Sequence, residues 1–527
     1  MTCLRNMRAS RILFLGLLSA AIACPAPAPA PGWQHSEQPK PPASTWQLLT
    51  WRAAIGPRSF VTEHEGVFNG IRIAYRATVA ETTVRDTTGR PAASVFTIAY
   101  TATGVADPGS RPVIFIFNGG PGAASGILHF GAFGPKRMAA FTSGARADVK
   151  TPLVENAYTV LDVADLVFID PPETGFSRLL PGIPATTFRS VDGDSSAVAQ
   201  VVALWLKATG RLASPKYVAG ESYGTVRAIA LARDLAQSKP KIELDGLILI
   251  SQAITYNGPR NLGGRNTNPV AAINRLPEMA ATAWYHGKID NKRQTVWEAM
   301  DKARIFARTG YAEALLLGNR LDAAGRRCVA EQLASLTGIP ATDYLAHKLR
   351  VQDFRGQLLR DEGLLLGRYD SRETQEAAAF DGKRDWETAM MGITANMNEY
   401  ASRVLRVTGV GDYVTLVPDP GFGESWRYIE PPAPTLDVIL TEQMRANPNL
   451  RLMVPLGIFD MTSSVGSTEL IFSQLDISAD RVKLRYYPGG HVFYSDLASL
   501  KAFTSDVRAF VGNQPMTTGA VNVSPAR

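Results

Sequence analysis

A serine stands at the centre of residues 220–224, which read Gly-Glu-Ser-Tyr-Gly and form the chain's single Gly-x-Ser-x-Gly pattern. A short apolar strand, 216–219, precedes this segment, and a helical pattern begins at Thr225. A serine on a tight strand-to-helix turn presents its hydroxyl above the edge of a sheet, and the helix N-terminus offers N–H groups that can hold an oxyanion. This context predicts that Ser222 is a nucleophile rather than a serine that only completes a turn.

A nucleophilic serine needs a base, and the base needs an acid that orients it. On a fold that carries this turn, the acid follows the serine in the chain and the histidine follows the acid. Of the six histidines, His491 alone comes after a late strand, at the end of the segment Tyr-Pro-Gly-Gly-His. Asp460 follows the apolar run 450–456, whereas Asp480 precedes a strand and so belongs to the opposite edge of the sheet. Chain order and position therefore select Ser222, Asp460 and His491.

A glycine-rich loop, residues 118–122 with the sequence Asn-Gly-Gly-Pro-Gly, follows the apolar run 112–117. A backbone N–H of this loop and that of Tyr223 are expected to form the oxyanion hole of an acyl-transfer site. The alternative is a phosphate-binding loop, which is disfavoured because no Lys-Ser or Lys-Thr follows.

The elements that must position these residues alternate between strand and helix. Short apolar runs recur at 112–117, 166–169, 217–219, 247–250, 450–456 and 482–487, with helical stretches such as 197–208 and 226–237 between several of them. This alternation predicts an α/β fold with a mostly parallel central sheet flanked by helices. Residues 269–407 contain no comparable strand run and are expected to form a helical insertion that roofs the cleft. The core would then comprise residues 46–268 and 408–512.

Composition excludes several classes of protein. The 527 residues are 45% hydrophobic and 20% charged, which excludes a disordered, collagenous or disulfide-scaffold protein. The excess of 55 Lys and Arg over 48 Asp and Glu (55 − 48 = +7) is scattered along the chain, so nucleic-acid binding gains no support.

The N-terminus has the three-part pattern of a signal peptide, with three arginines, an apolar run and the small residues Ala21 and Ala23. We expect residues 1–23 to be removed on export, which lowers the charge to 52 − 48 = +4. Cys24 also fits a bacterial lipobox, so cleavage by signal peptidase I and cleavage by signal peptidase II are both possible. The protein is therefore expected in the periplasm or secreted, or anchored in the cell envelope by a lipid on Cys24. A proline-rich linker, 24–45, and a flexible tail, 513–527, flank the folded part, in which Cys328 is expected to be a small buried residue without a partner.

Three motifs together resemble bacterial-type members of the serine carboxypeptidase family (peptidase family S10). These are the segments 118–122, 220–224 and 489–491, and residues 170–177, Asp-Pro-Pro-Glu-Thr-Gly-Phe-Ser, resemble a fourth. The resemblance implies an α/β-hydrolase fold and an enzyme that removes C-terminal residues from peptides. It implies Ser222 as nucleophile, His491 as base, Asp460 as orienting acid, and Gly120 and Tyr223 as oxyanion donors. It further implies that Asn118, Gly119 and Glu221 bind the terminal carboxylate of the substrate.

The chain departs from the family pattern at two places. Ala123 and Ala124 stand where the family loop has Cys and Ser, which removes a disulfide partner. Fourteen residues after Asn118 the family has a glutamate that shares a proton with the residue matching Glu221, and here that position is Ala132. Two adjacent carboxyls retain a proton because they cannot both ionise cheaply. Without that partner, Glu221 is expected to ionise and to repel a substrate carboxylate.

The sequence thus predicts an exported serine carboxypeptidase that cleaves peptides through an acyl-enzyme on Ser222. An esterase or acyltransferase with the same triad is one alternative, and a non-catalytic envelope binding protein is another. The substrate would be a peptide or another acyl compound. No metal or other cofactor is expected, because the histidines are dispersed and no His-Glu-x-x-His or cysteine pair occurs.

Overall fold

A central sheet of ten strands organises the fold in the computed structural model, which describes residues 57–139, 151–254, 268–380, 384–429 and 433–516. Nine strands follow the order β1-β2-β3-β7-β4-β9-β10-β13-β14, and β8 pairs with β3. The first four strands of this order pair antiparallel and the remaining neighbours pair parallel. The strands are β1 (Ser59–Phe68), β2 (Ile71–Arg85), β3 (Pro91–Ala102), β4 (Val113–Phe117), β7 (Asp165–Ile169), β8 (Arg178–Leu179), β9 (Lys216–Glu221), β10 (Gly246–Ile250), β13 (Arg451–Gly457) and β14 (Val482–Tyr487).

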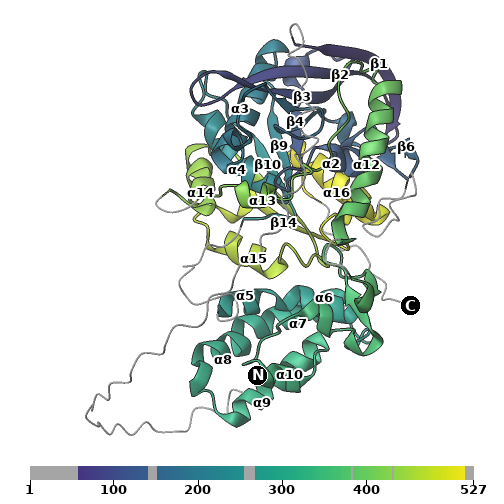
Figure 1. Ribbon diagram of the computed structural model, residues 1–527. Helices are drawn as coiled ribbons and strands as arrows, with labels where there is room; N and C mark the ends of the chain where they lie inside the picture. The colour runs from purple at the N-terminus through teal and green to yellow at the C-terminus, as the bar shows by residue number, and fades with distance from the viewer. Residues whose placement is uncertain (1–56, 140–150, 255–267, 381–383, 430–432, 517–527) are drawn as a thin grey trace, which may run out of the picture.

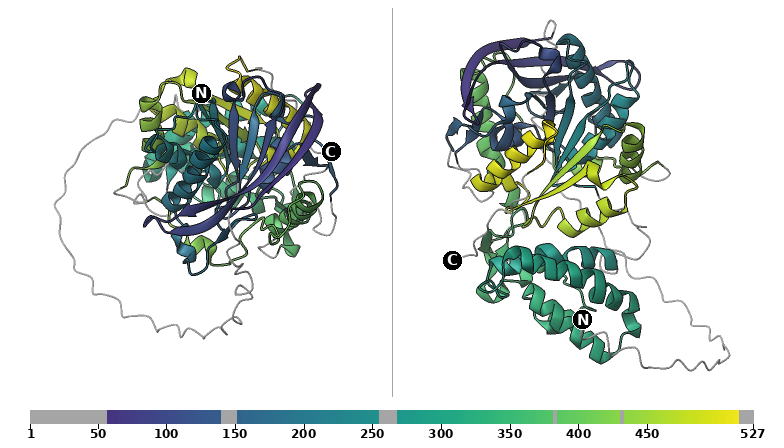
Figure 2. Two further views of the ribbon diagram at one scale, coloured as in Figure 1. Left: turned by 90° about the horizontal axis from the view of Figure 1, so that it is seen from above. Right: turned by 180° about the vertical axis from the view of Figure 1, so that it is seen from behind.

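Helices cover both faces of this sheet (Figures 1 and 2). One face packs against α3 (Val191–Ala208), α4 (Tyr223–Ala236) and α14 (Leu436–Ala446). The other packs against α2 (Gly126–Leu128), α12 (Arg384–Arg403) and α16 (Leu497–Val511). All five residues of β4 are buried, with Ile114 and Ile116 in one core and the alternate residues in the other. Burial on both faces explains the continuous apolar strand runs of the sequence.

A second body of helices lies beside the sheet domain (Figure 1). One apolar cluster lies almost entirely within it, and a second is shared with Ile458, Phe459 and Val465 of the sheet domain. The helical body comprises α5 (Pro269–Asn274), α6 (Leu276–Tyr285), α7 (Val296–Phe306), α8 (Ala312–Leu317), α9 (Ala323–Thr337), α10 (Ala341–Ala346) and α11 (Phe354–Gln357), followed by a hairpin of β11 (Leu364–Leu366) and β12 (Thr374–Glu376). The insertion predicted over 269–407 thus divides in two, because α12 returns to the sheet. Ile393, Met397 and Tyr400, which share one face of α12, lie in the sheet core.

A carboxylate shared by two arginines joins the helical body to the sheet domain. Glu469 of α15 (Val465–Gln474) accepts hydrogen bonds from Arg304 Nε at 2.8 Å and Arg308 Nη2 at 2.7 Å. Tyr486 of β14 donates to the same carboxylate at 3.0 Å. The helical body is therefore fixed to both the α15 helix and the last strand.

Three expectations about the chain's periphery have different outcomes. Cys328 of α9 is half-buried and disulfide-bonded, so the expectation of a buried residue without a partner is wrong. The predicted signal peptide 1–23, the linker 24–45 and most of the tail 513–527 lie outside the described residues. Among the helices that are described, none has the length and apolar character needed to cross a membrane.

Candidate active site

Ser222 lies in a strained turn between β9 and α4. Its backbone has φ 56° and ψ −126°, a conformation that costs a non-glycine residue about 1–3 kcal/mol. The flanking glycines permit the turn, because a Cβ on Gly220 would lie 2.2 Å from the carbonyl oxygen of Gly224. Ser222 begins α4, yet its side chain makes no capping hydrogen bond to the helix. The Ser222 hydroxyl thus lies at the end of a buried strand and does not cap the helix.

The predicted base and acid form a buried pair. The Nδ1 atom of His491 lies 2.7 Å from Oδ2 of Asp460, and both side chains are at most 2% exposed. The second oxygen of Asp460 accepts hydrogen bonds from the backbone and hydroxyl of Thr462 and from the backbone of Ser463. Burial alone would lower the pKa of His491, but the charge and hydrogen bond of Asp460, aided by the charge of Glu221, raise it. With Nδ1–H directed at Asp460, the neutral ring offers Nε2 as the base.

Ser251 connects the nucleophile turn to the histidine loop. The backbone N–H of Ser222 donates to the carbonyl of Ile250 at 2.9 Å, and the hydroxyl of the next residue, Ser251, donates to the carbonyl of His491 at 2.7 Å. Ser463 in turn donates to the Ser251 carbonyl at 3.0 Å. Ser251 has a positive φ of 45° and is fully buried. Sequence analysis missed this residue, although a polar residue directly after a buried strand run is a signal that could have identified it.

The glycine-rich loop packs directly against the nucleophile turn. A Cβ on Gly119 would lie 2.4 Å from the backbone nitrogen of Tyr223, so only glycine permits this approach. Gly120 has φ 98°, in the region that favours glycine. The predicted oxyanion donors, Gly120 and Tyr223, therefore belong to two segments in direct contact.

A buried ion pair stabilises the contact between the glycine-rich loop and the turn at Ser222. Arg227 of α4 donates from Nη1 to the carbonyl of Asn118 at 2.6 Å and from Nε to Asp194 at 2.7 Å. Tyr223 donates its hydroxyl to the same carboxylate at 3.2 Å. Arg227 and Asp194 are 1% and 3% exposed, so the pair is shielded from solvent.

Glu221 is a buried carboxyl next to the nucleophile. Burial raises its pKa to about 7, against the opposing effects of the His491 charge and of hydrogen bonding by Tyr494 and Asn118. Tyr494 donates its hydroxyl to Oε2 of Glu221. The amide nitrogen of Asn118 is buried and makes no hydrogen bond of normal geometry to the described residues. Burial therefore gives Glu221 a reason to hold its proton that does not depend on a second carboxyl.

Ala132 occupies a fully buried position in the π-helical turn η4 (His129–Phe133). Its carbonyl accepts a hydrogen bond from the Asn156 side chain at 2.8 Å. A Cβ on the neighbouring Gly131 would lie 2.5 Å from the ring of Tyr494. The tyrosine therefore fills space beside the position where the family resemblance implies a second glutamate, and no local sequence signal identified it.

The segment between β11 and β12 holds the histidine loop. The backbone N–H of His491 donates to the carbonyl of Tyr369 at 2.5 Å, and that of Gly490 donates to Asp370 Oδ2 at 3.1 Å. A Cβ on Gly490 would lie 2.0 Å from the Tyr369 carbonyl oxygen. Arg372 pairs with Asp370 at 2.6 Å and fixes its carboxylate. The insertion thus contributes contacts that position the base.

The same segment also reaches the loop of the acid. Ser371 donates its backbone N–H to the carbonyl of Phe459, the residue before the acid, at 2.9 Å. The guanidinium of Arg372 lies over the Phe459 ring at 5.3 Å from its centroid. Ser371 is itself held by Thr282 and His286 of the helical body, at 2.6 and 2.7 Å. Both loops that carry the base and its acid are therefore anchored on the insertion.

Asp170, the first residue of the fourth family-like motif, is buried behind the glycine-rich loop. Its Oδ1 accepts from the backbone and hydroxyl of Ser125, at 2.9 and 2.7 Å, and from the hydroxyl of Tyr413 at 2.9 Å. A Cβ on Gly175 would lie 1.8 Å from the other carboxylate oxygen. The motif therefore stabilises the chain that leaves the oxyanion loop.

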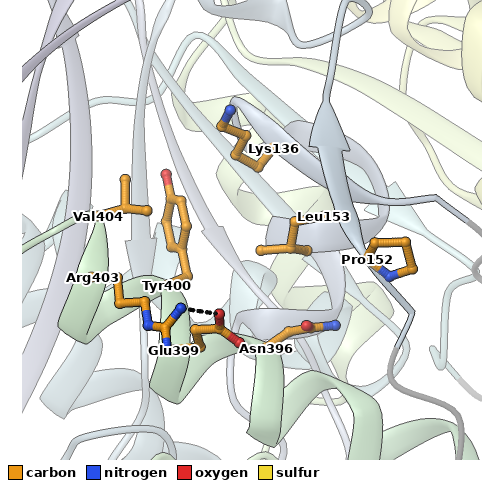
Figure 3. A pocket seen from close by; sticks show the side chains of 8 residues that line it. All are labelled: Lys136, Pro152, Leu153, Asn396, Glu399, Tyr400, Arg403 and Val404. Carbon is orange, nitrogen blue, oxygen red and sulfur yellow. Dashed lines mark ion pairs between the residues drawn. The ribbon is translucent and has the colours of Figure 1, made fainter.

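The remaining polar candidates lie apart from this site. His129 is fully buried beside Tyr100, and burial lowers its pKa to about 3. The described residues contain no group of His, Cys, Asp and Glu that could hold a metal ion. A cavity of about 390 Å³ opens between α12 and the hairpin of β5 (Lys136–Met138) and β6 (Leu153–Glu155), with the Glu399–Arg403 ion pair along its wall (Figure 3). No residue of the triad lines this cavity.

Comparisons with known proteins agree with this architecture. The family model for serine carboxypeptidases matches residues 88–327, which include Ser222 but neither Asp460 nor His491. A prohormone-processing carboxypeptidase from Saccharomyces cerevisiae is similar over 83% of this chain and 91% of its own, with 13% identity and a TM-score of 0.51. A proline iminopeptidase from Mycobacterium smegmatis is similar over 82% of this chain and 98% of its own, with 14% identity and a TM-score of 0.35. No curated protein sequence matches the chain. The α/β-hydrolase fold and the resemblance to serine carboxypeptidases are confirmed.

Proposed function

Because this chain is a serine hydrolase related to the serine carboxypeptidases, we propose that it releases C-terminal residues from peptides through an acyl-enzyme on Ser222. The observation that carries the proposal is the position of Glu221, a buried carboxyl with a pKa of about 7 directly before the nucleophile. A carboxypeptidase needs a protonated carboxyl there, because a neutral acid can donate a hydrogen bond to the terminal carboxylate of a peptide.

The triad supplies the chemistry of the proposed reaction. His491 takes the proton of the Ser222 hydroxyl as the oxygen attacks the scissile carbonyl, and the ion pair with Asp460 stabilises the imidazolium that forms. The backbone N–H groups of Gly120 and Tyr223 hold the developing oxyanion. His491 then gives its proton to the leaving amine, which departs as the free C-terminal amino acid. Water, activated by the same histidine, hydrolyses the ester to Ser222 and restores the enzyme.

Three groups would hold the substrate's terminal carboxylate. The buried amide nitrogen of Asn118 has an unused donor, and the protonated Glu221 has another. The backbone N–H of Gly119 lies in the same loop, pressed against the nucleophile turn. A carboxylate placed among these donors sets the scissile bond one residue from the C-terminus.

Export is part of the proposal and rests on the leader-like sequence of residues 1–23. The mature N-terminus can be read by mass spectrometry of the purified native protein. A start at residue 24 supports cleavage. A lipid mass on Cys24 that is lost in Cys24→Ser would support anchoring and would exclude Cys24 as the disulfide partner of Cys328 in the cleaved protein. A retained residue 1 would contradict export by this route.

A matched set of substrates tests the activity. An N-blocked dipeptide with a free C-terminal carboxylate is compared with its C-terminal amide and with a simple ester that lacks a carboxylate. The proposal expects a higher kcat/KM for the free acid than for the amide, and loss of all hydrolysis in Ser222→Ala. Equal rates on acid and amide with fast ester hydrolysis would instead identify an esterase. Absence of both hydrolysis and fluorophosphonate labelling at Ser222 would indicate a binding protein.

A further inference from the structure

Tyr494 is a buried phenol whose position is fixed by packing. It belongs to the short turn η12 (Phe493–Ser495), three residues after the base, and is 1% exposed. Its ring stacks on Phe503 with centroids 6.4 Å apart and contacts Phe493 edge-on at 5.6 Å. On its other side the ring abuts Gly131, where a Cβ would lie 2.5 Å away. The hydroxyl therefore has little freedom to move.

This hydroxyl is directed at the carboxyl beside the nucleophile. Tyr494 donates to Oε2 of Glu221. A protonated carboxyl has one O–H donor and one acceptor oxygen. A phenol that donates to Oε2 marks this oxygen as the acceptor and leaves the proton for Oε1. Burial and the nearby Glu221 charge raise the pKa of Tyr494, so the phenol stays protonated and remains a donor.

We propose that Tyr494 is a positioning residue for C-terminal carboxylate recognition, acting by orienting the Glu221 carboxyl so that its free oxygen faces the substrate. This inference rests on the proposed carboxypeptidase function. The tyrosine packs beside the turn that carries Ala132, where the resemblance implies a second glutamate. It does not share a proton with Glu221 as a second carboxyl would, and acts only by fixing the orientation of the carboxyl. Unlike a second carboxyl, the phenol adds no negative charge at neutral pH.

The expected effect of Tyr494→Phe follows from the groups that surround Glu221. These are the imidazole of His491, the Asp460 carboxylate, the amide of Asn118 and the phenol itself. The phenol stabilises the ionised form of Glu221, so its removal raises the pKa of Glu221. Removal of the phenol also frees the Glu221 carboxyl to rotate, which weakens its hydrogen bond to the substrate carboxylate. We therefore expect KM for a free-acid dipeptide to increase about tenfold, the scale of a hydrogen bond to a charged group, while kcat changes little.

The experiment measures kcat and KM against pH for wild type and Tyr494→Phe, on the free-acid dipeptide and on a simple ester without a carboxylate. Tyr487→Phe is the matched control. Tyr487 belongs to the same aromatic cluster, but its hydroxyl donates to Asp506 and not to Glu221. The expected result is a higher KM for the acid and an alkaline limb moved to higher pH in Tyr494→Phe alone. Kinetic constants for the ester should stay within about twofold of wild type.

Two outcomes would overturn the inference. One is an unchanged KM and pH profile for the acid in Tyr494→Phe, and the other is an equal loss on acid and ester, which would indicate a structural role only. If Tyr494→Phe does not fold, Gly131→Ala gives a second route, because the added Cβ must displace the ring and should raise KM for the acid selectively. A wild-type enzyme that shows no preference for the acid over its amide would refute the proposed function itself, whatever the variants do.

Discussion

The substitution Glu221→Gln keeps the size of the side chain beside the nucleophile but removes its ability to ionise. In wild type the pKa of Glu221 is raised from 4.5 to about 7 by burial. The protonated fraction is then about 0.9 at pH 6 and about 0.1 at pH 8. If only the protonated form accepts a substrate carboxylate, kcat/KM for a free-acid dipeptide falls about tenfold across this interval. In Glu221→Gln the amide stays neutral, so this alkaline decline should disappear.

The acid side of the profile should change little. Glu221 raises the pKa of His491 only when it is ionised, and with a pKa of about 7 it is mostly protonated below pH 7. The acidic limb, which His491 sets, should therefore stay close to that of wild type in Glu221→Gln. Profiles of kcat/KM from pH 5 to 9 on the free acid and its amide provide the assay. An alkaline limb that persists in Glu221→Gln, or that is equally steep on the amide, would refute the role of this carboxyl.

The pH dependence of unfolding tests the raised pKa of Glu221 without a substrate. Because the folded state holds the Glu221 proton more tightly than the unfolded chain does, its contribution to stability is complete below pH 4.5 and is lost as pH rises through about 7. The shift corresponds to about 3 kcal/mol. Urea titrations at pH 5 and pH 8 should therefore show wild type losing about 3 kcal/mol more than Glu221→Gln between the two conditions. Parallel losses would mean that the carboxyl titrates normally.

Three further substitutions probe the supporting contacts. Asp370→Ala should lower kcat by up to about a hundredfold with a smaller change in KM, because the histidine loop loses an anchor. The exposed Asp361→Ala is its control, and equal kinetics in the two variants would refute the role of Asp370 in positioning His491. Asp194→Ala breaks a buried ion pair and should reduce the free energy of unfolding by about 3–5 kcal/mol in urea titrations, whereas a loss below 1 kcal/mol would contradict the pairing. Ala132 is fully buried, so Ala132→Glu should lower Tm by overpacking worth about 1–3 kcal/mol, and an unchanged Tm with a shifted pH optimum would show that the space is open.

The buried strands and the residues at their ends could be predicted from the sequence because each depends on a local pattern. Asp460 follows the buried strand β13, and His491 follows β14, the partly buried last strand of the sheet order; chain order leaves few competitors. The structure places their side chains 2.7 Å apart. The close packing at Gly119 is likewise encoded locally, since a glycine pair after a buried strand signals a close backbone approach.

Contacts between distant segments could not be predicted in the same way. Tyr494 and Glu221 are 273 residues apart, and nothing near either residue indicates the other. The packing of α12 against the sheet was not predicted, for a related reason. The composition of α12 resembles that of the preceding helices, and only packing shows that Tyr400 lies in the sheet core. Burial likewise decides the protonation of Glu221, and a motif carries no information about desolvation.

The short stretch from Tyr369 to Arg372 makes the helical insertion inseparable from the hydrolase. In many enzymes a lid can be exchanged between relatives as a module, because it touches only the substrate. Here the insertion carries the carbonyl of Tyr369 and the carboxylate of Asp370, which accept hydrogen bonds from the backbone N–H groups of His491 and Gly490. A chimera that received a foreign insertion would inherit a misaligned histidine even if every helix folded.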